Sequence, residues 1–390
     1  MKRIIFTGGG TGGHVYPGLA VYDALPTAMK PAVLWIGSRH GVERGIVRTR
    51  GIPYRHVRTG KLRRYFDLKN VTDLFKVVIG TVESTVLLGR LDAAVVFSKG
   101  GFVAVPVVIA ARLRGIPIVI HESDADPGLA TRITAPFARV ICVPYEETAR
   151  YFVRPGNRRN WSNRPARRVV VTGNPVRAAF FTADSGDVLS RLGLVETDDP
   201  VILITGGSLG ARQLNDWVEQ TVSVLTRRAV VIHQTGEGEK HRIDGIRKRA
   251  EAGRYYGVPT FTDIFPAVLR RADMVVARAG AGTVWELAAT ARPAVLVPLS
   301  RGASRGDQIR NAERYRRSGC AVVIDNPTAD ASEFLTVLGD MLDNPGKRNA
   351  MADAARVWAG ENAAVEIAGL IQEYVGDRYV AGHSGPLLDD

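Results

Sequence analysis

Two segments of this chain share a layout that leaves few folds open. In each, a short apolar run leads into a glycine-rich segment and then into an apolar pattern with helical spacing. The first is Ile4–Thr7 followed by Gly8–His14, and the second is Val201–Thr205 followed by Gly206–Gly210. A strand, a glycine-rich turn and a helix present main-chain N–H groups at the positive end of a helix dipole, which suits an anion such as phosphate. Two such segments predict two α/β domains and an enzyme whose ligand carries phosphate.

The remaining apolar runs extend this pattern along the chain of 390 residues. Short β-branched runs alternate with helical patterns, which is typical of doubly wound α/β domains with parallel sheets. The expected strands are Arg3–Thr7, Ala32–Ile36, Ala93–Phe97, Pro117–His121, Val140–Val143, Arg168–Thr172, Val201–Thr205, Ala229–Gln234, Met274–Ala277, Ala294–Pro298 and Ala321–Ile324. A chain of this length exceeds what one core usually supports, so two domains are expected.

The net charge of +13 points to an anionic partner. Phosphorylated substrates, an anionic membrane surface and nucleic acid all fit such a charge. The basic residues are not interleaved with aromatic ones and no nucleic-acid module is recognisable, so we expect no nucleic acid partner. No apolar segment reaches the roughly 18 residues of a membrane span. Cys142 and Cys320 lie in apolar runs, which favours reduced thiols in a cytosolic protein.

The first glycine segment also fits a dinucleotide site. Gly8, Gly10 and Gly13 match G-x-G-x-x-G. That motif needs an acidic residue after the second strand, where this chain has Ser38 and Arg39; Arg39 could instead meet a 2′-phosphate, so a nicotinamide cofactor stays an alternative. His14 adds a group that moves protons near neutral pH, which a binding loop alone does not need.

Two further features lie in the first half. His121 and Glu122 end a predicted strand and either hold the following loop or belong to a site at the edge of the sheet. Gly100 and Gly101 follow another strand and form either a second anion-binding nest or a tight turn. No group of His, Cys, Asp and Glu has the spacing of metal ligands, so no metal is expected.

The second half carries a polar set after two predicted strands. In Arg278–Glu286, small residues allow a ligand to come close, and Glu286 is expected on the first helical turn beyond the loop. Its carboxylate could accept two ribose hydroxyls, or it could simply satisfy the helix dipole. Asp307 and Gln308 precede the next helical pattern and suit the hydroxyls and amides of a sugar.

Two segments are rich in basic residues, and no catalytic or binding motif lies in them. Lys61–Leu88 combines lysines and arginines with apolar residues at helical spacing, which predicts either a core helix or a helix on an anionic membrane surface. Arg154–Arg168 is rich in arginine and reads as an exposed loop near the domain boundary.

Taken together, these motifs resemble glycosyltransferase family 28. The resemblance rests on Gly8–Ala20, Gly100–Phe102, His121–Glu122, Gly173–Arg177, Gly206–Ala211 and Arg278–Glu286, which run in family order over nearly the whole chain. It implies the GT-B fold, two Rossmann-like domains with parallel sheets facing across a cleft. The implied domains are residues 1–170 with a C-terminal helix at about 360–376, and residues 171–358, followed by a flexible tail at 377–390.

The activity that the resemblance implies is transfer of N-acetylglucosamine (GlcNAc) from UDP-GlcNAc. The acceptor is the C4 hydroxyl of N-acetylmuramyl-pentapeptide on undecaprenyl pyrophosphate (lipid I), and the products are lipid II and UDP, formed with inversion. Such an enzyme of peptidoglycan synthesis works as a peripheral protein on the cytoplasmic face of the plasma membrane, in contact with its anionic surface, and needs no cofactor.

The resemblance also assigns residues. His14 is implied as the general base, and Gly9, Gly10, Gly100 and Gly101 as the site of the acceptor pyrophosphate. The implied UDP-GlcNAc contacts are Thr11, Gly12, Gly13, Asp124, Arg177, Ser208, Thr262, Ala281, Gly282, Thr283, Glu286, Asp307 and Gln308. The chain departs from the usual family pattern at Ser123 and Asp124, where Gln and Asn are usual, and at Asp307, where Gln is usual.

Three other functions stay open at this point. One is a GT-B enzyme that glycosylates diacylglycerol, and another is a GT-B epimerase acting on UDP-GlcNAc alone, which would need no membrane-facing surface. The third is a basic binding module without activity, which leaves Gly206–Gly210 and Glu286 unexplained.

Overall fold

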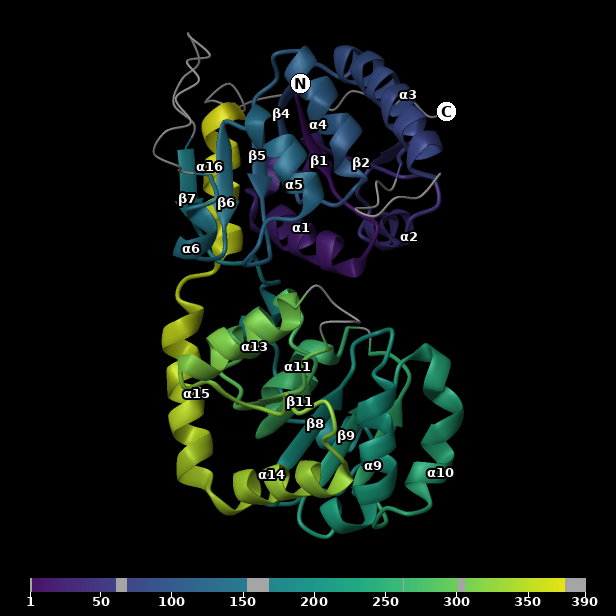
Figure 1. Ribbon diagram of the computed structural model, residues 1–390, viewed down its shortest axis with the longest axis vertical. Helices are drawn as coiled ribbons and strands as arrows, with labels where there is room; N and C mark the ends of the chain where they lie inside the picture. Colours follow the sequence, from purple (N-terminus) through teal and green to yellow (C-terminus); the bar gives the residue numbers. More distant parts are fainter. Residues whose placement is uncertain (1, 61–68, 153–167, 262, 301–305, 376–390) are drawn as a thin grey trace. The chain divides into compact units, whose positions relative to one another are not determined.

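The chain folds into two compact units, each built on one sheet (Figure 1). This computed structural model describes residues 2–60, 69–152, 168–261, 263–300 and 306–375. The first unit comprises Met1–Arg177 and Asn362–Asp390, and the second comprises Ala178–Glu361. The expected Arg154–Arg168 loop, apart from its last residue, and the tail at 377–390 lie outside the described residues.

The first unit is organised by a seven-stranded sheet in the order β3-β2-β1-β4-β5-β6-β7. All of its neighbouring strands are parallel. The strands are β1 (Arg3–Thr7), β2 (Val33–Gly37), β3 (Tyr54–His56), β4 (Ala93–Ser98), β5 (Ile118–His121), β6 (Val140–Val143) and β7 (Arg168–Val171). The chain order reverses between β1 and β4, and ligands bind at this kind of switch point in open α/β sheets.

Helices cover both faces of this sheet. They are α1 (Gly12–Ala24), α2 (Val42–Thr49), α3 (Lys69–Arg90), α4 (Ala104–Leu113), α5 (Leu129–Thr134), α6 (Glu146–Ala149) and α16 (Ala363–Val375), with short 3₁₀ turns at Thr27–Ala32 and Ala135–Phe137. Alternate residues of β1 enter opposite cores. Ile4 and Phe6 pack with α1 and α16, whereas Ile5 packs with α4. Burial on both faces explains why this strand is a continuous apolar run.

The last helix belongs to the first unit although the second unit precedes it in sequence. In Figure 1, α16 (yellow) lies beside the purple and teal elements of the first unit. Ile367 and Ile371 are fully buried in the same core as Phe6 and Trp35. The Asn362 side chain, just before α16, donates to the carbonyl oxygen of Val176 at 3.0 Å.

The second unit repeats the design with a six-stranded parallel sheet in the order β10-β9-β8-β11-β12-β13. The strands are β8 (Val201–Thr205), β9 (Val230–Gln234), β10 (Tyr255–Val258), β11 (Met274–Ala277), β12 (Ala294–Leu296) and β13 (Ala321–Val323). The helices are α7 (Ala179–Thr182), α8 (Val188–Arg191), α9 (Arg212–Leu225), α10 (Ile243–Arg247), α11 (Phe265–Arg271), α12 (Ala281–Ala289), α13 (Asp307–Arg317), α14 (Ala331–Asp343) and α15 (Pro345–Ala359), with a 3₁₀ turn at Glu237–Arg242. The switch point here lies between β8 and β11.

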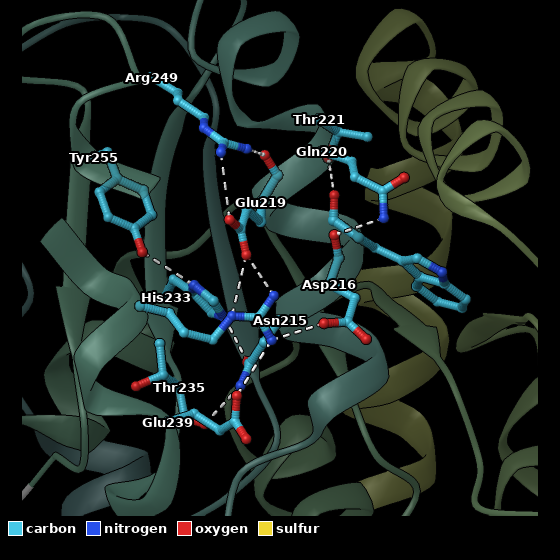
Figure 2. A network of polar contacts seen from close by, with 12 residues as sticks. Asn215, Asp216, Glu219, Gln220, Thr221, His233, Thr235, Glu239, Arg249 and Tyr255 are labelled. Carbon is cyan, nitrogen blue, oxygen red and sulfur yellow. Dashed lines mark hydrogen bonds and ion pairs between the residues drawn. The ribbon is translucent and has the colours of Figure 1, made fainter. Parts of the chain in front are cut away.

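A buried polar network joins α9 to the sheet of the second unit (Figure 2). His233 on β9 donates from Nε2 to the Asn215 side-chain oxygen at 3.0 Å and accepts at Nδ1 from the Tyr255 hydroxyl at 3.1 Å. Asn215 in turn donates to the carbonyl oxygen of Thr235 at 3.0 Å, which fixes its amide orientation. Burial, with a smaller effect of Arg242, lowers the pKa of His233 to about 3. The folded state therefore excludes a proton that the unfolded state accepts, and this contribution to stability is lost as pH falls from about 6.5 towards 3.

The observed strands confirm the expected α/β fold class. Each of the eleven expected strands is present, with ends that differ by no more than two residues. Two edge strands, β3 and β10, were not expected. No helix among the described residues is long and apolar enough to cross a membrane.

Candidate active site

The Gly8–His14 segment connects β1 to α1 at the switch point of the first sheet. Gly10 has φ +88°, and a Cβ there would stand 2.6 Å from the ring of Phe102. Gly101 has φ +78°, and a Cβ there would stand 2.5 Å from the Gly9 carbonyl oxygen and 3.0 Å from the His14 ring. Glycine at these positions therefore allows the two loops to touch, and the sequence-predicted Gly9, Gly10, Gly100, Gly101 and His14 come together.

A buried carboxylate holds the first glycine loop in place. Glu43 on α2 accepts from the Gly10 N–H at 3.0 Å and from both the N–H and the hydroxyl of Ser38. The Trp35 indole N–H donates to the Gly8 carbonyl oxygen at 3.1 Å. The N–H of Gly10 is thus already hydrogen-bonded to protein, and its glycine serves the shape of the loop. No sequence motif predicted this role of Glu43.

His14 lies in the first turn of α1, where its ring faces Gly101. Within the described residues, its Nδ1 is buried without a hydrogen-bond partner. Burial lowers the pKa of His14 to about 4; the charge of Lys99 adds to this, and Glu122 opposes it. The ring is therefore neutral at pH 7 and can accept a proton.

Near His14 lies a lysine for which no sequence motif predicted a role. Lys99, at the end of β4, is 2% exposed, and its ammonium donates to the Ser123 hydroxyl at 2.6 Å. Burial lowers the pKa of Lys99 to about 8, while the carboxylates of Glu122 and Asp124 raise it, so the ammonium is mostly protonated at pH 7. The sequence signal that could have pointed to Lys99 is its position between an apolar run and two glycines.

His121 and Glu122 have structural partners. His121 is fully buried and donates to the Gly173 carbonyl oxygen at 2.9 Å. The Glu122 carboxylate accepts from the N–H groups of Ser123, Asp124 and Gly128 at 2.8, 3.1 and 3.0 Å. These contacts favour the interpretation in which the pair holds the loop after β5.

The remaining first-unit candidates surround the same loop. Thr11 precedes α1, and Gly12 and Gly13 form its first turn. The guanidinium of Arg177 stacks 5.2 Å from the centre of the Tyr16 ring on α1. Cation–π contact of this kind holds the charge of Arg177 near the start of that helix.

In the second unit, Gly206–Gly210 connects β8 to α9. The Gly207 N–H donates to the Thr205 hydroxyl at 3.0 Å, and a Cβ at Gly210 would stand 2.2 Å from the Thr235 carbonyl oxygen. Ser208 is exposed at the tip of this loop. The loop therefore presents a hydroxyl and main-chain groups ahead of a helix N-terminus, as the sequence predicted.

Helix α12 begins at Ala281, after the short loop that follows β11, the second strand of this switch point. Ala281, Gly282 and Thr283 form its first turn, and Glu286 lies in the second turn. The expectation that Glu286 lies in the first turn was wrong, because the loop ends at Gly280 and the helix starts earlier than the glycine pattern suggested, with Gly282 already inside it. An interaction of its carboxylate with the helix N-terminus is correspondingly weaker.

Asp307 and Gln308 open α13 after Gly306, which has φ +78°. The Gln308 side-chain oxygen accepts from the Leu299 N–H at 3.0 Å, and Asp307 forms an ion pair with Arg310. The side chain of Asn311 donates to the Ala279 carbonyl oxygen at 3.1 Å, which joins α13 to the segment before α12. Thr262, another predicted contact, lies outside the described residues.

Family models match both units. The N-terminal domain of glycosyltransferase family 28 matches residues 4–143, and the C-terminal domain of this family matches residues 201–370. The chain belongs to glycosyltransferase family 28. The family, the fold class and the transferase activity predicted from the sequence are thereby confirmed.

Individual members of family 28 are similar over nearly their whole length. A protein of Treponema denticola, named UDP-N-acetylglucosamine--N-acetylmuramyl-(pentapeptide) pyrophosphoryl-undecaprenol N-acetylglucosamine transferase, is 40% identical over 96% of this chain and 98% of its own length. A protein of the same name from Lachnoclostridium phytofermentans is also 40% identical, over 96% of this chain and 99% of its own length. The crystal structure of Acinetobacter baumannii MurG aligns with a TM-score of 0.70 and 29% identity, covering 96% of this chain and all of that one.

This family 28 chain also exposes an apolar face on α3. Six of its side chains are between 41% and 65% exposed: Leu74, Phe75, Val78, Ile79, Val82 and Val86. Their spacing places them along one side of the helix. An unbroken row of exposed apolar side chains is unusual on a surface that meets only water.

A cationic groove of about 1180 Å³ adjoins α3 and the glycine loop. Gly10 and Phe102 line it, as do Ile79 and Leu87 of α3. Its cationic lining comprises Arg39, Arg44, Arg48, Arg55, Arg58 and Lys76, and His40 and His56 also line it. Among the described residues of this lining, Glu83 is the one carboxylate, and it pairs with Arg58 at 3.3 Å.

Proposed function

We propose that this chain transfers GlcNAc from UDP-GlcNAc to the C4 hydroxyl of lipid I, giving lipid II and UDP with inversion. The observation that carries the proposal is the 40% identity, over 96% of the chain, to a protein named for this reaction. The proposal is also supported by His14 and the two glycine loops, which follow β1 and β8 as the sequence predicted.

His14 is the proposed general base. Its neutral ring takes the proton of the acceptor C4 hydroxyl as the oxygen forms a bond to the anomeric carbon of GlcNAc. The bond between that carbon and the β-phosphate oxygen breaks at the same time, and its electron pair leaves with UDP. A positioned base contributes roughly 10²–10⁴ to the rate of such a step.

Residues of both units are proposed to bind UDP-GlcNAc, with most of them in the second unit. In the second unit, Ser208, Thr262, Ala281–Thr283, Glu286, Asp307 and Gln308 are assigned to UDP-GlcNAc, with Glu286 on the ribose. The N–H groups of Gly206–Gly210 and the helix N-terminus behind them favour the negative charge that develops on leaving UDP. From the first unit, Thr11, Gly12, Gly13, Asp124 and Arg177 are assigned to the donor.

The acceptor pyrophosphate is proposed to bind at the glycines of the first unit. Gly9, Gly100 and Gly101 supply main chain beside His14, and Gly10 shapes the loop through its bond to Glu43. The cationic groove beside Gly10 provides a positive field that favours an anionic acceptor.

An assay with labelled UDP-GlcNAc tests the reaction. We expect label to enter lipid I, with no transfer to diacylglycerol and no epimerised sugar in the absence of acceptor. Turnover of diacylglycerol but not of lipid I would contradict the proposal in favour of the first alternative enzyme. The exposed apolar face of α3 already argues against the epimerase, which needs no membrane-facing surface.

We further propose that α3 rests on an anionic membrane surface, so that the enzyme is peripheral on the cytoplasmic face of the plasma membrane. The exposed row Leu74–Val86 supplies apolar contact, and the adjoining groove supplies positive charge. Apolar burial and attraction to anionic lipid together are what hold an interfacial helix on a bilayer.

Polar substitutions on α3 should weaken vesicle binding. Phe75 and Val82 are 65% and 60% exposed, so F75S/V82S should cost little stability. Loss of their contact with lipid should lower affinity for vesicles of anionic phospholipid by at least about tenfold, as measured by co-sedimentation. The matched control is V357S on α15, since Val357 is 85% exposed outside α3. If F75S/V82S and V357S bind vesicles equally well, α3 does not form the membrane contact.

A further inference from the structure

We propose that Thr205 and Gln234 are positioning residues for the second glycine loop, Gly206–Gly210. Hydrogen bonds that run from this loop through Thr205 to Gln234 set its shape for the pyrophosphate of UDP-GlcNAc. The inference rests on the proposed function, which assigns the loop to the donor. It adds two residues for which no sequence motif predicted a role.

The two side chains lie next to each other at the end of the second sheet. Thr205 ends β8 and Gln234 ends β9, and the two residues are partners in the parallel register of these strands. Thr205 is 4% exposed and Gln234 is 5% exposed. Polar side chains buried to this extent need hydrogen-bond partners inside the protein, so the partners that they have indicate their role.

Two consecutive hydrogen bonds connect these side chains to the loop. The Gly207 N–H donates to the Thr205 hydroxyl oxygen at 3.0 Å, and the Thr205 hydroxyl donates to Gln234 Oε1 at 2.8 Å. A hydroxyl has one proton, and here Gln234 receives it, so the lone pairs of the oxygen remain for Gly207. Removal of the Thr205 hydroxyl therefore breaks both bonds.

The anchored residue is the one at which the loop turns. Gly207 has φ +74°, and its carbonyl oxygen accepts from the Gly210 N–H at 3.0 Å, which closes the turn. The N–H groups of Gly207 and Gly210 are thus used within the protein. In the part of the chain that the structure describes, the N–H groups of Ser208 and Leu209, between them, have no protein partner and remain for an anion.

The end of β9 supports the loop from a second direction. A Cβ at Gly236 would stand 2.4 Å from the Gly210 Cα, so the loop lies directly against the segment that follows β9. The network of Figure 2 holds this segment, because the Asn215 side chain donates to the Thr235 carbonyl oxygen at 3.0 Å. Gln234 therefore belongs to a well-anchored segment, and Thr205 connects that segment to Gly207.

The consequence concerns the orientation of the loop's main-chain groups. N–H groups at the start of a helix bind an anion when they point at it, and this effect depends on a fixed geometry. Without the bond to Thr205, the peptide groups after Gly207 are free to rotate. Binding of the donor pyrophosphate should then weaken, whereas binding of the acceptor, which is proposed in the first unit, should not change.

Calorimetric titration with UDP-GlcNAc tests the role of Thr205 without requiring turnover. Valine has nearly the shape of threonine but lacks the hydroxyl, so T205V should lower affinity for UDP-GlcNAc about tenfold. T205S keeps the hydroxyl and should restore nearly the unmodified affinity. The matched control is T221V, because the buried Thr221 hydroxyl donates to the Trp217 carbonyl oxygen at 2.7 Å within α9 and has no bond to the loop. T221V should bind UDP-GlcNAc like the unmodified chain.

Substitution of Gln234 tests whether the two residues act together. Q234M removes the acceptor of the Thr205 proton but leaves Gly207 its acceptor, so its loss of affinity should be smaller than that of T205V. T205V/Q234M should bind no more weakly than T205V, because both substitutions interrupt the same pair of bonds. Losses that add up in the double variant would show that Gln234 acts independently of Thr205 and would contradict the proposal.

Steady-state kinetics separate positioning from a general loss of structure. In T205V, KM for UDP-GlcNAc should rise while KM for lipid I stays unchanged; partial unfolding would instead lower kcat through the active fraction and leave both KM values alone. Unchanged affinity for UDP-GlcNAc in T205V, or an equal loss in T205V and T205S, would overturn the proposal. If T205V does not fold, Q234M provides the test, and unaltered donor affinity there also counts against it. Binding of UDP-GlcNAc without any turnover of lipid I would contradict the proposed function and leave the titrations valid.

Discussion

Replacing His14 by alanine should lower kcat at least roughly 100-fold while UDP-GlcNAc binding survives. The reason is that the acceptor hydroxyl loses the group that takes its proton, and loss of a general base has this magnitude. The donor contacts proposed in the second unit do not involve His14. Steady-state kinetics with lipid I and calorimetric titration with UDP-GlcNAc measure the two quantities.

The control for this substitution is His241→Ala, which removes an exposed histidine of the second unit. It should leave both kcat and donor affinity unchanged. A near-normal kcat for His14→Ala would exclude His14 as the base. Loss of donor binding in that variant would instead point to a misfolded loop, which circular dichroism and thermal unfolding would reveal.

Replacing Glu43 by alanine should have the largest effect on stability. Its carboxylate is fully buried and accepts from three donors, the N–H of Gly10 and the N–H and hydroxyl of Ser38. Removal leaves these donors unsatisfied and opens a cavity beside the glycine loop. We expect the free energy of unfolding to fall by about 3 kcal/mol or more, as measured by urea denaturation.

Glu43→Gln separates the shape of this side chain from its charge. The amide fills the same volume and keeps one acceptor oxygen, so its loss of stability should be smaller than that of Glu43→Ala. Glu237→Ala, at an exposed position, serves as the control and should be nearly neutral. A change of under about 0.5 kcal/mol for Glu43→Ala would show that the glycine loop does not depend on this carboxylate.

The sequence predicted the central strands of both sheets because those strands are buried on both faces. Val201–Thr205 and Val140–Val143 are continuous apolar runs, and such runs are typical of parallel sheets. The two strands that were missed, β3 and β10, lie at the equivalent edge of each sheet. An edge strand pairs on one side only, so β3 can consist of Tyr54, Arg55 and His56 with two of the three exposed.

The parts of the candidate site that act through main-chain groups could be predicted from the sequence. Glycines mark turns through their conformational freedom, so the two loops were recognisable from their spacing. The residues that support them were not recognisable, because Glu43 and Lys99 act through contacts between segments far apart in sequence. The expected helical position of Glu286 was wrong because α12 starts at Ala281, within the run of small residues, and the glycine pattern does not mark where the loop ends.

The return of α16 to the first unit has a consequence for synthesis on the ribosome. Its residues Ala363, Ile367 and Ile371 complete the core beneath Phe6 and Trp35. A chain that emerges from its N-terminus cannot bury these groups until the whole second unit has been translated. At about 5–20 residues per second, that interval of nearly 200 residues lasts roughly 10–40 s. During this time one face of the first sheet lacks its last helix, so the newborn chain exposes apolar surface that chaperones would bind.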